Sequence, residues 1–307
     1  MDELILHHYP NSPFAEKVRV ALGLKQLAWR SVIIPMIMPK PDLLPLTGGY
    51  RKTPVLQIGA DIYCDTQLIL RELERRFPER TLYRGTDAGT ANALALWSDR
   101  NLFTPAVALT LAGRAGMVPA AFFEDRSKFA GREINAERIQ AAAPLMLDQL
   151  RAQLDWCETM LSDGRAFLLG EHPTLVDCAV YHPCWFIRAH LGDAAAPLPE
   201  FPRLLPWMDR VRALGHGSSS ELDGKAALRI AKDAQPQATR RADPGDPFGR
   251  KPGDRVQVVP DDTGRDPVSG ELLAISRDEI VILRSDEQVG EVAVHFPRVG
   301  FVVQAAQ

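Results

Sequence analysis

The stretch from Tyr9 to Arg19, YPNSPFAEKVR, constrains the fold of this chain most, because it joins an apolar run to the start of a helix. Leu4–Leu6 reads as part of a strand, and residues 13–24 read as a helix. Ser12 stands at the N-cap and Pro13 at the first helical position, where its missing N–H costs nothing. This turn brings a hydroxyl and several free N–H groups to one point, which favours an anion such as a thiolate or carboxylate.

Composition excludes several classes of protein. The 307 residues are 46% apolar and 24% charged, which is typical of a soluble globular protein with two or three domains. A net charge of -3 argues against a nucleic-acid binder. No apolar run approaches about 18 residues, so we expect no membrane-spanning helix. The acidic start, MDELILHHYP, lacks a basic segment, so we expect no signal peptide.

The four cysteines are scattered and form neither a CxxC pair nor a zinc-ligand pattern with histidine. We therefore expect core cysteines, no metal, and a reducing, cytoplasmic compartment. His7 and His8 lie in the first predicted strand, where we expect them to be structural. The cysteines are Cys64, Cys157, Cys178 and Cys184.

Residues 1–82 alternate strand-like and helix-like segments in the order β-α-β, then β-β-α. The first half predicts parallel strands joined by a right-handed crossover, and the second half a hairpin followed by a helix. The predicted strands are residues 4–9, 28–34, 54–58 and 62–64, and the predicted helices are 13–24 and 65–77.

From residue 87 to 234 the strand signals vanish and alanine and leucine dominate, which predicts an all-helical domain. Residues 136–161 have the spacing of a long amphipathic helix. Thr174 and Asp177 fit a capping box for a helix that runs to about His190, and Pro183 should kink it. We expect this capping box to be a folding element rather than a site.

The last part of the chain changes character again. Residues 235–251 are polar and rich in proline and glycine, which predicts a linker. Residues 252–307 contain four or five short alternating segments separated by turn residues, which predicts a small antiparallel β-barrel, such as an SH3-like barrel.

Residues 1–234 together resemble the cytosolic glutathione transferase family. YPNSPFAEKVR is similar to its serine-type signature, with the key hydroxyl just before the first helix. Lys52-Thr53-Pro54-Val55 resembles the loop before its third strand, where the proline is cis, and Asp65-Thr66 stands where the family usually has an acidic residue and a serine. The resemblance implies a thioredoxin-like domain, an all-α domain and a homodimer. Thr53, Thr66 and the tail after about residue 235 depart from the family pattern.

The resemblance also assigns roles to residues. The Ser12 hydroxyl would donate to the glutathione sulfur, although a plain N-cap is the alternative for it. The Thr53 backbone beside Pro54 would pair with the peptide part of glutathione. Asp65 and Thr66 would hold the γ-glutamyl end, in addition to capping a helix. Lys52 would pair with the glycyl carboxylate or, equally, remain solvated.

The energy that Ser12 must supply is modest. A free thiol has a pKa of about 8.5, and lowering it by about two units takes roughly 2.7 kcal/mol. A hydrogen bond to a charged acceptor contributes about 1.5–3 kcal/mol and a helix N-terminus about 0.3–1 kcal/mol, so no general base is required. The Tyr9 hydroxyl or the Asn11 amide could instead point into the same site.

These features predict a glutathione transferase-like enzyme that activates the thiol for attack on a small apolar electrophile, held by helices between residues 92 and 116. One alternative is a non-catalytic ligand-binding scaffold that acts through its C-terminal β domain. Another is a glutathione-dependent isomerase, dehalogenase or peroxidase. Disulfide exchange is disfavoured, because serine at position 12 is not a redox nucleophile.

Overall fold

The computed structural model describes residues 3–306, so residues 1–2 and 307, at the outer ends of the first and last predicted domains, lie outside it. The predicted β-α-β unit forms, and its two strands pair in parallel. The predicted hairpin is antiparallel and leads into a helix, and an additional short helix, α2, precedes it. The elements are β1 (Ile5–His8), α1 (Pro13–Leu24), β2 (Ala28–Ile33), α2 (Leu44–Thr47), β3 (Val55–Ile58), β4 (Asp61–Cys64), α3 (Thr66–Arg76) and the 3₁₀ turn η1 (Pro78–Arg80).

The middle of the chain is helical, as predicted. α8 begins at the capping box, in which Thr174 and Asp177 bond each other's backbone, and it continues through Pro183. None of the helices in residues 3–306 is long and apolar enough to cross a membrane. The elements are α4 (Ala88–Trp97), the π-helical turn η2 (Ser98–Leu102), α5 (Phe103–Gly113), η3 (Ala115–Met117), α6 (Ala120–Ala130), α7 (Ala136–Met160), α8 (Leu175–Leu191), η4 (Leu198–Glu200) and α9 (Leu204–Arg212).

One strand lies where the sequence predicted only helix. β5 (Ser218–Glu221) pairs with β2 in parallel, and α10 (Gly224–Asp233) follows it. The expectation that residues 87–234 contain no strand was therefore wrong. The physical reason is that β5 is SSSE, four exposed polar residues with no apolar alternation, so it is held by backbone pairing rather than by burial. α10 packs Ala227, Leu228 and Ala231 into the core that it shares with α2 and the C-terminal strands.

The C-terminal strands continue the first sheet. They are antiparallel to one another, as predicted, but β9 also pairs in parallel with β4, which gives the strand order β10-β6-β7-β8-β9-β4-β3-β1-β2-β5. No pairing between β9 and β10 closes a barrel in residues 3–306, so the closed barrel stays a prediction. The alternating pattern of each strand does not specify that β4 is a partner. The strands are β6 (Arg255–Pro260), β7 (Val268–Ile275), β8 (Glu279–Asp286), β9 (Gly290–Pro297) and β10 (Phe301–Ala305).

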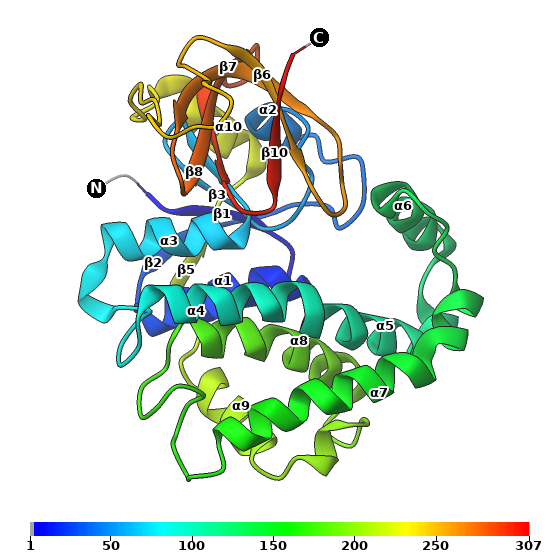
Figure 1. Ribbon diagram of the computed structural model, residues 1–307. Helices are drawn as coiled ribbons and strands as arrows, with labels where there is room; N and C mark the ends of the chain where they lie inside the picture. The colour runs from blue at the N-terminus through cyan, green and yellow to red at the C-terminus, as the bar shows by residue number, and fades with distance from the viewer. Residues whose placement is uncertain (1–2, 307) are drawn as a thin grey trace.

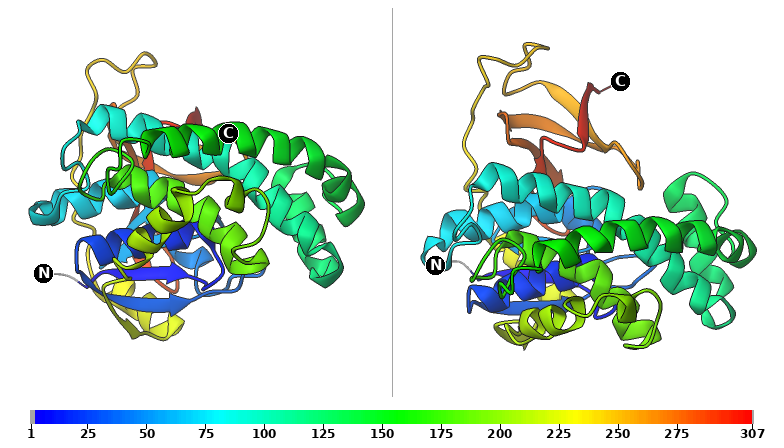
Figure 2. Two further views of the ribbon diagram at one scale, coloured as in Figure 1. Left: turned by 90° about the horizontal axis from the view of Figure 1, so that it is seen from below. Right: turned by 60° about the horizontal axis from the view of Figure 1, so that its bottom comes forward.

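The layers follow from the two large apolar cores among residues 3–306, beside which a small cluster of four buried residues lies within the C-terminal strands. One core joins α1 and α3 to the helical domain, and includes Leu22, Leu73 and Trp207. The other joins β1 to β4 with α2, α10 and the C-terminal strands, and includes Val294 and Phe296. In Figure 1 the C-terminal strands therefore lie at one end and α9 at the other, with α1 and α3 between them. The right-hand view of Figure 2 shows the same separation from another side. The predicted domain boundaries remain predictions, because one sheet crosses the last of them.

Candidate functional site

Ser12 lies at the turn between β1 and α1, as the sequence predicts. Its hydroxyl accepts a hydrogen bond from the Ala15 N–H at 3.2 Å, so it is a true N-cap. Its own N–H donates to the Tyr9 carbonyl at 3.1 Å, which closes the turn. The side chain is 2% exposed, whereas Asn11 beside it is exposed. Within residues 3–306 the Ser12 hydroxyl accepts this bond and donates none, so its oxygen is oriented by the cap and its proton can still be donated to a ligand.

The loop before β3 is tied to this turn by Lys40, a residue that the sequence analysis missed. The Thr53–Pro54 bond is cis. Lys40 Nζ donates to Thr53 Oγ1 at 2.9 Å and to the Arg51 carbonyl at 3.1 Å, and it lies 5.7 Å from the centre of the Tyr9 ring. Burial, together with the charges of Arg126 and Arg51, lowers the pKa of Lys40 to about 7.

Asp65 caps the N-terminus of α3, where its carboxylate accepts the Gln67 N–H at 2.9 Å. Asp65 has a φ of 74°, in the left-handed region. Burial raises the pKa of its carboxyl group above the usual value. A cationic group bound beside Asp65 would therefore favour its charged form, which suits the amino group expected there.

Thr66 is joined to α1 through a buried ionic network. Lys17 Nζ donates to Thr66 Oγ1 at 3.1 Å and pairs with Asp99 at 2.6 Å. The other Asp99 oxygen lies 3.1 Å from Nε2 of His182 on α8. Burial opposes the charge on Asp99, but Lys17 and His182 outweigh it and lower the pKa of this carboxyl group. The network fixes the start of α3 against α1 and against the helical domain.

Lys52 has a partner that the sequence analysis did not consider. Its Nζ lies 2.5 Å from Asp262 Oδ1, in the connection between β6 and β7. Lys52 is therefore ion-paired within the chain, whereas the sequence analysis considered it only as a ligand-binding or a solvated cation. The neighbouring Arg51 pairs with Asp125 of α6, so this end of the site contains two interdomain ion pairs.

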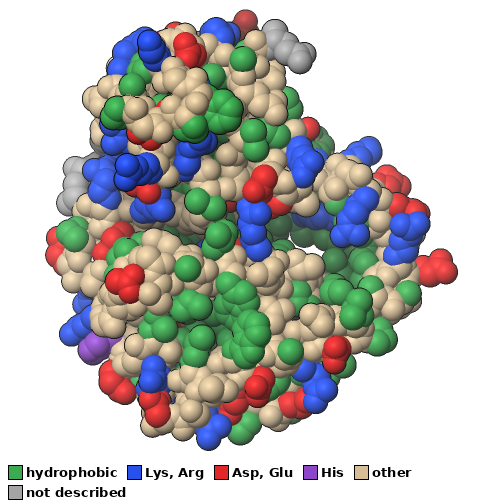
Figure 3. All heavy atoms as spheres, viewed as in Figure 1, with side chains coloured by type: hydrophobic (Ala, Val, Ile, Leu, Met, Phe, Trp, Pro, Cys, Tyr) green, Lys and Arg blue, Asp and Glu red, His purple; other side chains and the backbone are tan. Residues whose placement is uncertain are grey.

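Aromatic side chains from α1 and α5 lie beside the Ser12 turn. The ring centres of Phe14 and Phe103 are 4.6 Å apart, and both rings contact the buried His182. Both phenylalanines are half-buried, so they offer apolar surface where the two domains meet. Figure 3 shows the molecule hollowed between its upper part and the arm that carries α6, with hydrophobic side chains along the hollow. This arrangement suits an apolar second substrate.

Comparison with known proteins places the chain in a family. A family model of the glutathione S-transferase N-terminal domain matches residues 6–81, and a model of the C-terminal domain matches residues 138–210. A GST-like protein from Pseudomonas syringae, known from its crystal structure, is 42% identical and has a TM-score of 0.79. Its match covers 98% of this chain and 100% of that chain. The chain belongs to the glutathione S-transferase family.

The C-terminal strands of this transferase-family protein are shared by the Pseudomonas syringae protein, because that match spans nearly the whole chain. More distant structures show the fold alone. FzlA from C. crescentus is 24% identical, with 69% of this chain and 88% of that chain covered and a TM-score of 0.52. A glutathione S-transferase from Rhodospirillum rubrum F11 is 23% identical, with 68% and 88% covered and a TM-score of 0.52. No curated protein matches this chain.

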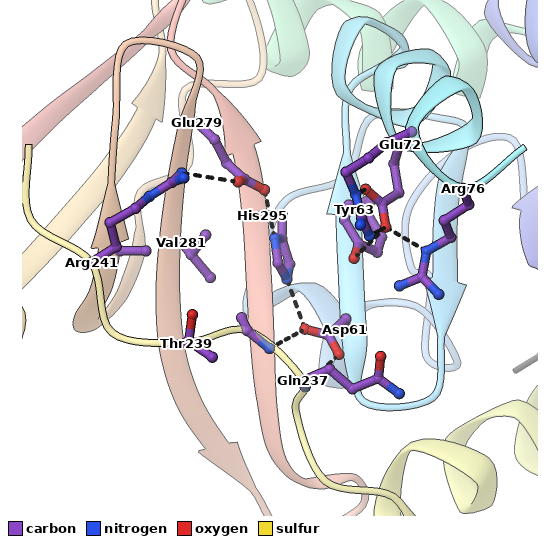
Figure 4. Close-up of a pocket in the computed structure, with 13 residues that line it drawn as sticks. Asp61, Tyr63, Glu72, Arg76, Gln237, Thr239, Arg241, Glu279, Val281 and His295 are labelled. Atoms are coloured by element: carbon purple, nitrogen blue, oxygen red, sulfur yellow. Dashed lines mark hydrogen bonds and ion pairs between the residues drawn. The ribbon is translucent and has the colours of Figure 1, made fainter. Parts of the chain in front are cut away.

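A pocket of about 420 Å³ lies elsewhere in this transferase-family protein, between β4, α3 and the C-terminal strands (Figure 4). His295 of β9 lines it, with Nε2 2.9 Å from Asp61 and Nδ1 2.7 Å from Glu279. Its ring stacks on Tyr63 with the ring centres 4.3 Å apart. Burial disfavours the charged ring, but the bonds to the two carboxylates raise the pKa of His295 to about 9. The predicted site residues do not line this pocket. We interpret the cluster as structural, because His295 joins β9 to β4 and β8 through Asp61, Tyr63 and Glu279.

The sequence analysis missed the charged residues that connect the loops of the glutathione transferase-like site. Lys17 lies within the YPNSPFAEKVR stretch and Lys40 precedes Lys52 by twelve residues, yet neither was assigned a role. Lys17 could have been identified in one way. A helix that packs between two layers has no face in solvent, so its charged residues must have buried partners. No local signal distinguishes Lys40 in the connection between the second and third predicted strands, or pairs Lys52 with Asp262 across 210 positions.

Proposed function

We propose that this protein is a serine-type glutathione transferase-like enzyme, in which Ser12 stabilises the thiolate of glutathione for attack on an apolar electrophile. One observation carries the proposal: Lys40 and Lys17 tie the Ser12 turn, the Thr53–Pro54 loop and the start of α3 into one site. These are the three segments on which the family resemblance rests. Family membership supports glutathione as the co-substrate.

The remaining site residues would bind the tripeptide. The N–H and C=O groups of Thr53, beside Pro54, would pair with its cysteinyl backbone like an added strand. Asp65 would face the amino group, and the N-terminus of α3 at Thr66 would receive the γ-glutamyl carboxylate. Tyr9 and Asn11 remain candidates for the wall of the site rather than for the thiol donor.

The test compares Ser12→Ala with Asp87→Ala, which removes the exposed N-cap of α4 far from the site. We expect turnover of a chloronitrobenzene electrophile to fall by about tenfold to a hundredfold in Ser12→Ala, because one hydrogen bond to a charged acceptor is lost. Asp87→Ala should lower stability without lowering turnover. Wild-type turnover in Ser12→Ala would show that another group activates the thiol.

Binding should also release a proton, which calorimetric titration in buffers of different ionisation enthalpy measures. Lys40 complicates the measurement, because a group with a pKa of about 7 takes up a proton when an anion binds nearby. Lys40→Gln removes this uptake. We expect net proton release in Lys40→Gln and its loss in the double variant with Ser12→Ala.

A ligand-binding module without turnover is the second candidate. The pairing of Lys52 with Asp262 favours it, because one cation expected to bind glutathione already has a partner. Glutathione binding without proton release, in both wild type and Lys40→Gln, would support this candidate over the enzyme. An isomerase, dehalogenase or peroxidase would share the glutathione half-site and differ in the second pocket.

We also propose a cytoplasmic homodimer, on the family pattern. Because β4 pairs with β9, the sheet ends at β5 and β10, and a dimer that used β4 would have to displace β9. We therefore expect the subunits to meet through helical surfaces. Analytical ultracentrifugation measures the mass in solution, and a monomer at micromolar concentration would contradict the dimer.

A further inference from the structure

The connection between β6 and β7 reaches into the candidate glutathione site from the C-terminal strands. We call residues 261–264 the bridging loop. In Figure 1 the connection between β6 and β7 descends from the C-terminal strands on the side of α6. Three contacts fasten it: Asp262 to Lys52 at 2.5 Å, Asp261 to Arg100 at 2.7 Å, and the Gly264 N–H to the Phe129 carbonyl at 2.8 Å.

The bridging loop is fitted to this place. Gly264 has a φ of +63°, and a Cβ built on it would lie 2.5 Å from the Phe129 ring, so only glycine allows the approach. The loop thereby contacts the Lys52 loop, the turn before α5 and α6 together. Its two carboxylates are exposed to solvent, and each is held in place by a cation of another element, Asp261 by Arg100 and Asp262 by Lys52.

The other cations near Lys52 are also engaged. Arg51 and Arg126 share Asp125, and Arg100 pairs with Asp261. Lys40 is 3% exposed and donates to two neutral oxygens inside the loop, so it is shielded from a ligand. Lys52 is the accessible cation predicted for the glycyl carboxylate, and the chain's own Asp262 already neutralises it.

We propose that Asp262 is a specificity-determining residue, which makes the site favour γ-glutamyl-cysteinyl thiols whose glycine end is uncharged, such as an amide or ester, over free glutathione. The inference rests on the proposed function, because it places the glycine end at Lys52. A free glycyl carboxylate that binds Lys52 must displace the Asp262 carboxylate or lie beside it. Two carboxylates that contact the same ammonium group repel each other. A neutral glycine end leaves the Lys52–Asp262 pair intact.

The test is calorimetric titration of the full chain with glutathione and with its glycyl monoethyl ester. The variants are Asp262→Asn and, as matched control, Asp278→Asn in the turn between β7 and β8, which removes an exposed ion pair with Arg71 of α3. We expect wild type to bind the ester at least as tightly as glutathione. Asp262→Asn should shift the affinity ratio about fivefold toward glutathione, since an exposed ion pair contributes up to about 1 kcal/mol. Asp278→Asn should keep the wild-type ratio.

Lys52→Gln distinguishes direct competition from a general charge effect. In the Lys52→Gln background, Asp262→Asn should no longer change the ratio as it does in wild type. An unchanged ratio in Asp262→Asn alone, or a wild type that binds free glutathione more tightly than the ester, would overturn the inference while leaving the glutathione site standing. Failure of both ligands to bind any variant would instead remove the proposed function, and this inference with it.

Discussion

His182, beneath the candidate site, and His295, between β4 and the C-terminal strands, are both buried and both bonded to an aspartate through Nε2. Burial lowers the pKa of His182 in spite of Asp99, whose charge is shared with Lys17. His295 faces two carboxylates, and its pKa rises to about 9. The number of carboxylates available to each buried imidazole thus decides its charge. His182, whose one carboxylate is shared with Lys17, is neutral at pH 7, whereas His295, with two carboxylates, is an imidazolium.

Lys17→Met should have the largest effect on this comparison. It leaves Asp99 buried with only the imidazole as a partner, and breaking a buried ion pair costs about 3–5 kcal/mol of unfolding free energy. The pKa of His182 should rise, because Asp99 is no longer shared. Urea denaturation measures the loss, with Arg71→Met, at an exposed pair, as the control expected within about 1 kcal/mol. A loss as small as the control's would show that Lys17 is not needed to hold Asp99.

His295→Gln should remove a pH-dependent stabilisation. The folded pKa of about 9 exceeds the ordinary 6.5, so protonated His295 stabilises fully below about pH 6.5, and this contribution is lost as pH rises through about 9. The gap corresponds to about 3 kcal/mol. Stability curves of wild type and variant should converge over this window. The groups that face the ring are Asp61, Glu279 and Tyr63, and Arg241 lies 3.9 Å from Glu279. A constant difference from pH 6 to pH 10 would mean that His295 is neutral.

Glu279→Gln should make His295 resemble His182, since one carboxylate would remain. We expect the pKa of His295 to fall by about one unit, which corresponds to about 1.4 kcal/mol. The titration of its ring protons by NMR measures the change. If the pKa remains at about 9, Asp61 alone holds the charge and the proposed carboxylate count is wrong.

His182→Gln should have the smallest effect, because a neutral amide replaces a neutral imidazole. We expect a loss of about 1 kcal/mol that is constant above pH 6.5, from one altered hydrogen bond. Because the folded pKa is lowered, wild type should lose stability relative to the variant as pH falls below about 6.5. The same denaturation series checks this, and an opposite slope would mean that His182 is charged in the folded protein.

Local patterns predicted the parts of the fold that depend on neighbouring residues. Ser12 and Pro13 fix the start of α1, and Thr174 and Asp177 cap α8, because each interaction spans three residues or fewer. Alternation located the C-terminal strands but not their partner. β5 escaped notice, because SSSE has no apolar face and is held by its neighbour's backbone.

The candidate site divides in the same way. The Ser12 turn, the Thr53–Pro54 loop and the start of α3 were found as segments, through the family resemblance. The contacts that connect them were not, since Lys17 reaches Asp99 across 82 positions and Lys52 reaches Asp262 across 210. Pairing at such distances depends on the packing of whole elements, which no local pattern encodes.

The pairing of β9 with β4 has a consequence for dissecting this protein by truncation. Ending the chain after Gln235 would leave β4 with a row of unpaired N–H and C=O groups, a template for intermolecular strand addition and aggregation. It would also uncover Ile62 and Cys64, whose burial depends on the shared core. Insolubility of a shortened chain would therefore report a bare sheet edge rather than a lost activity, and point substitutions in the bridging loop are the cleaner way to assign its role.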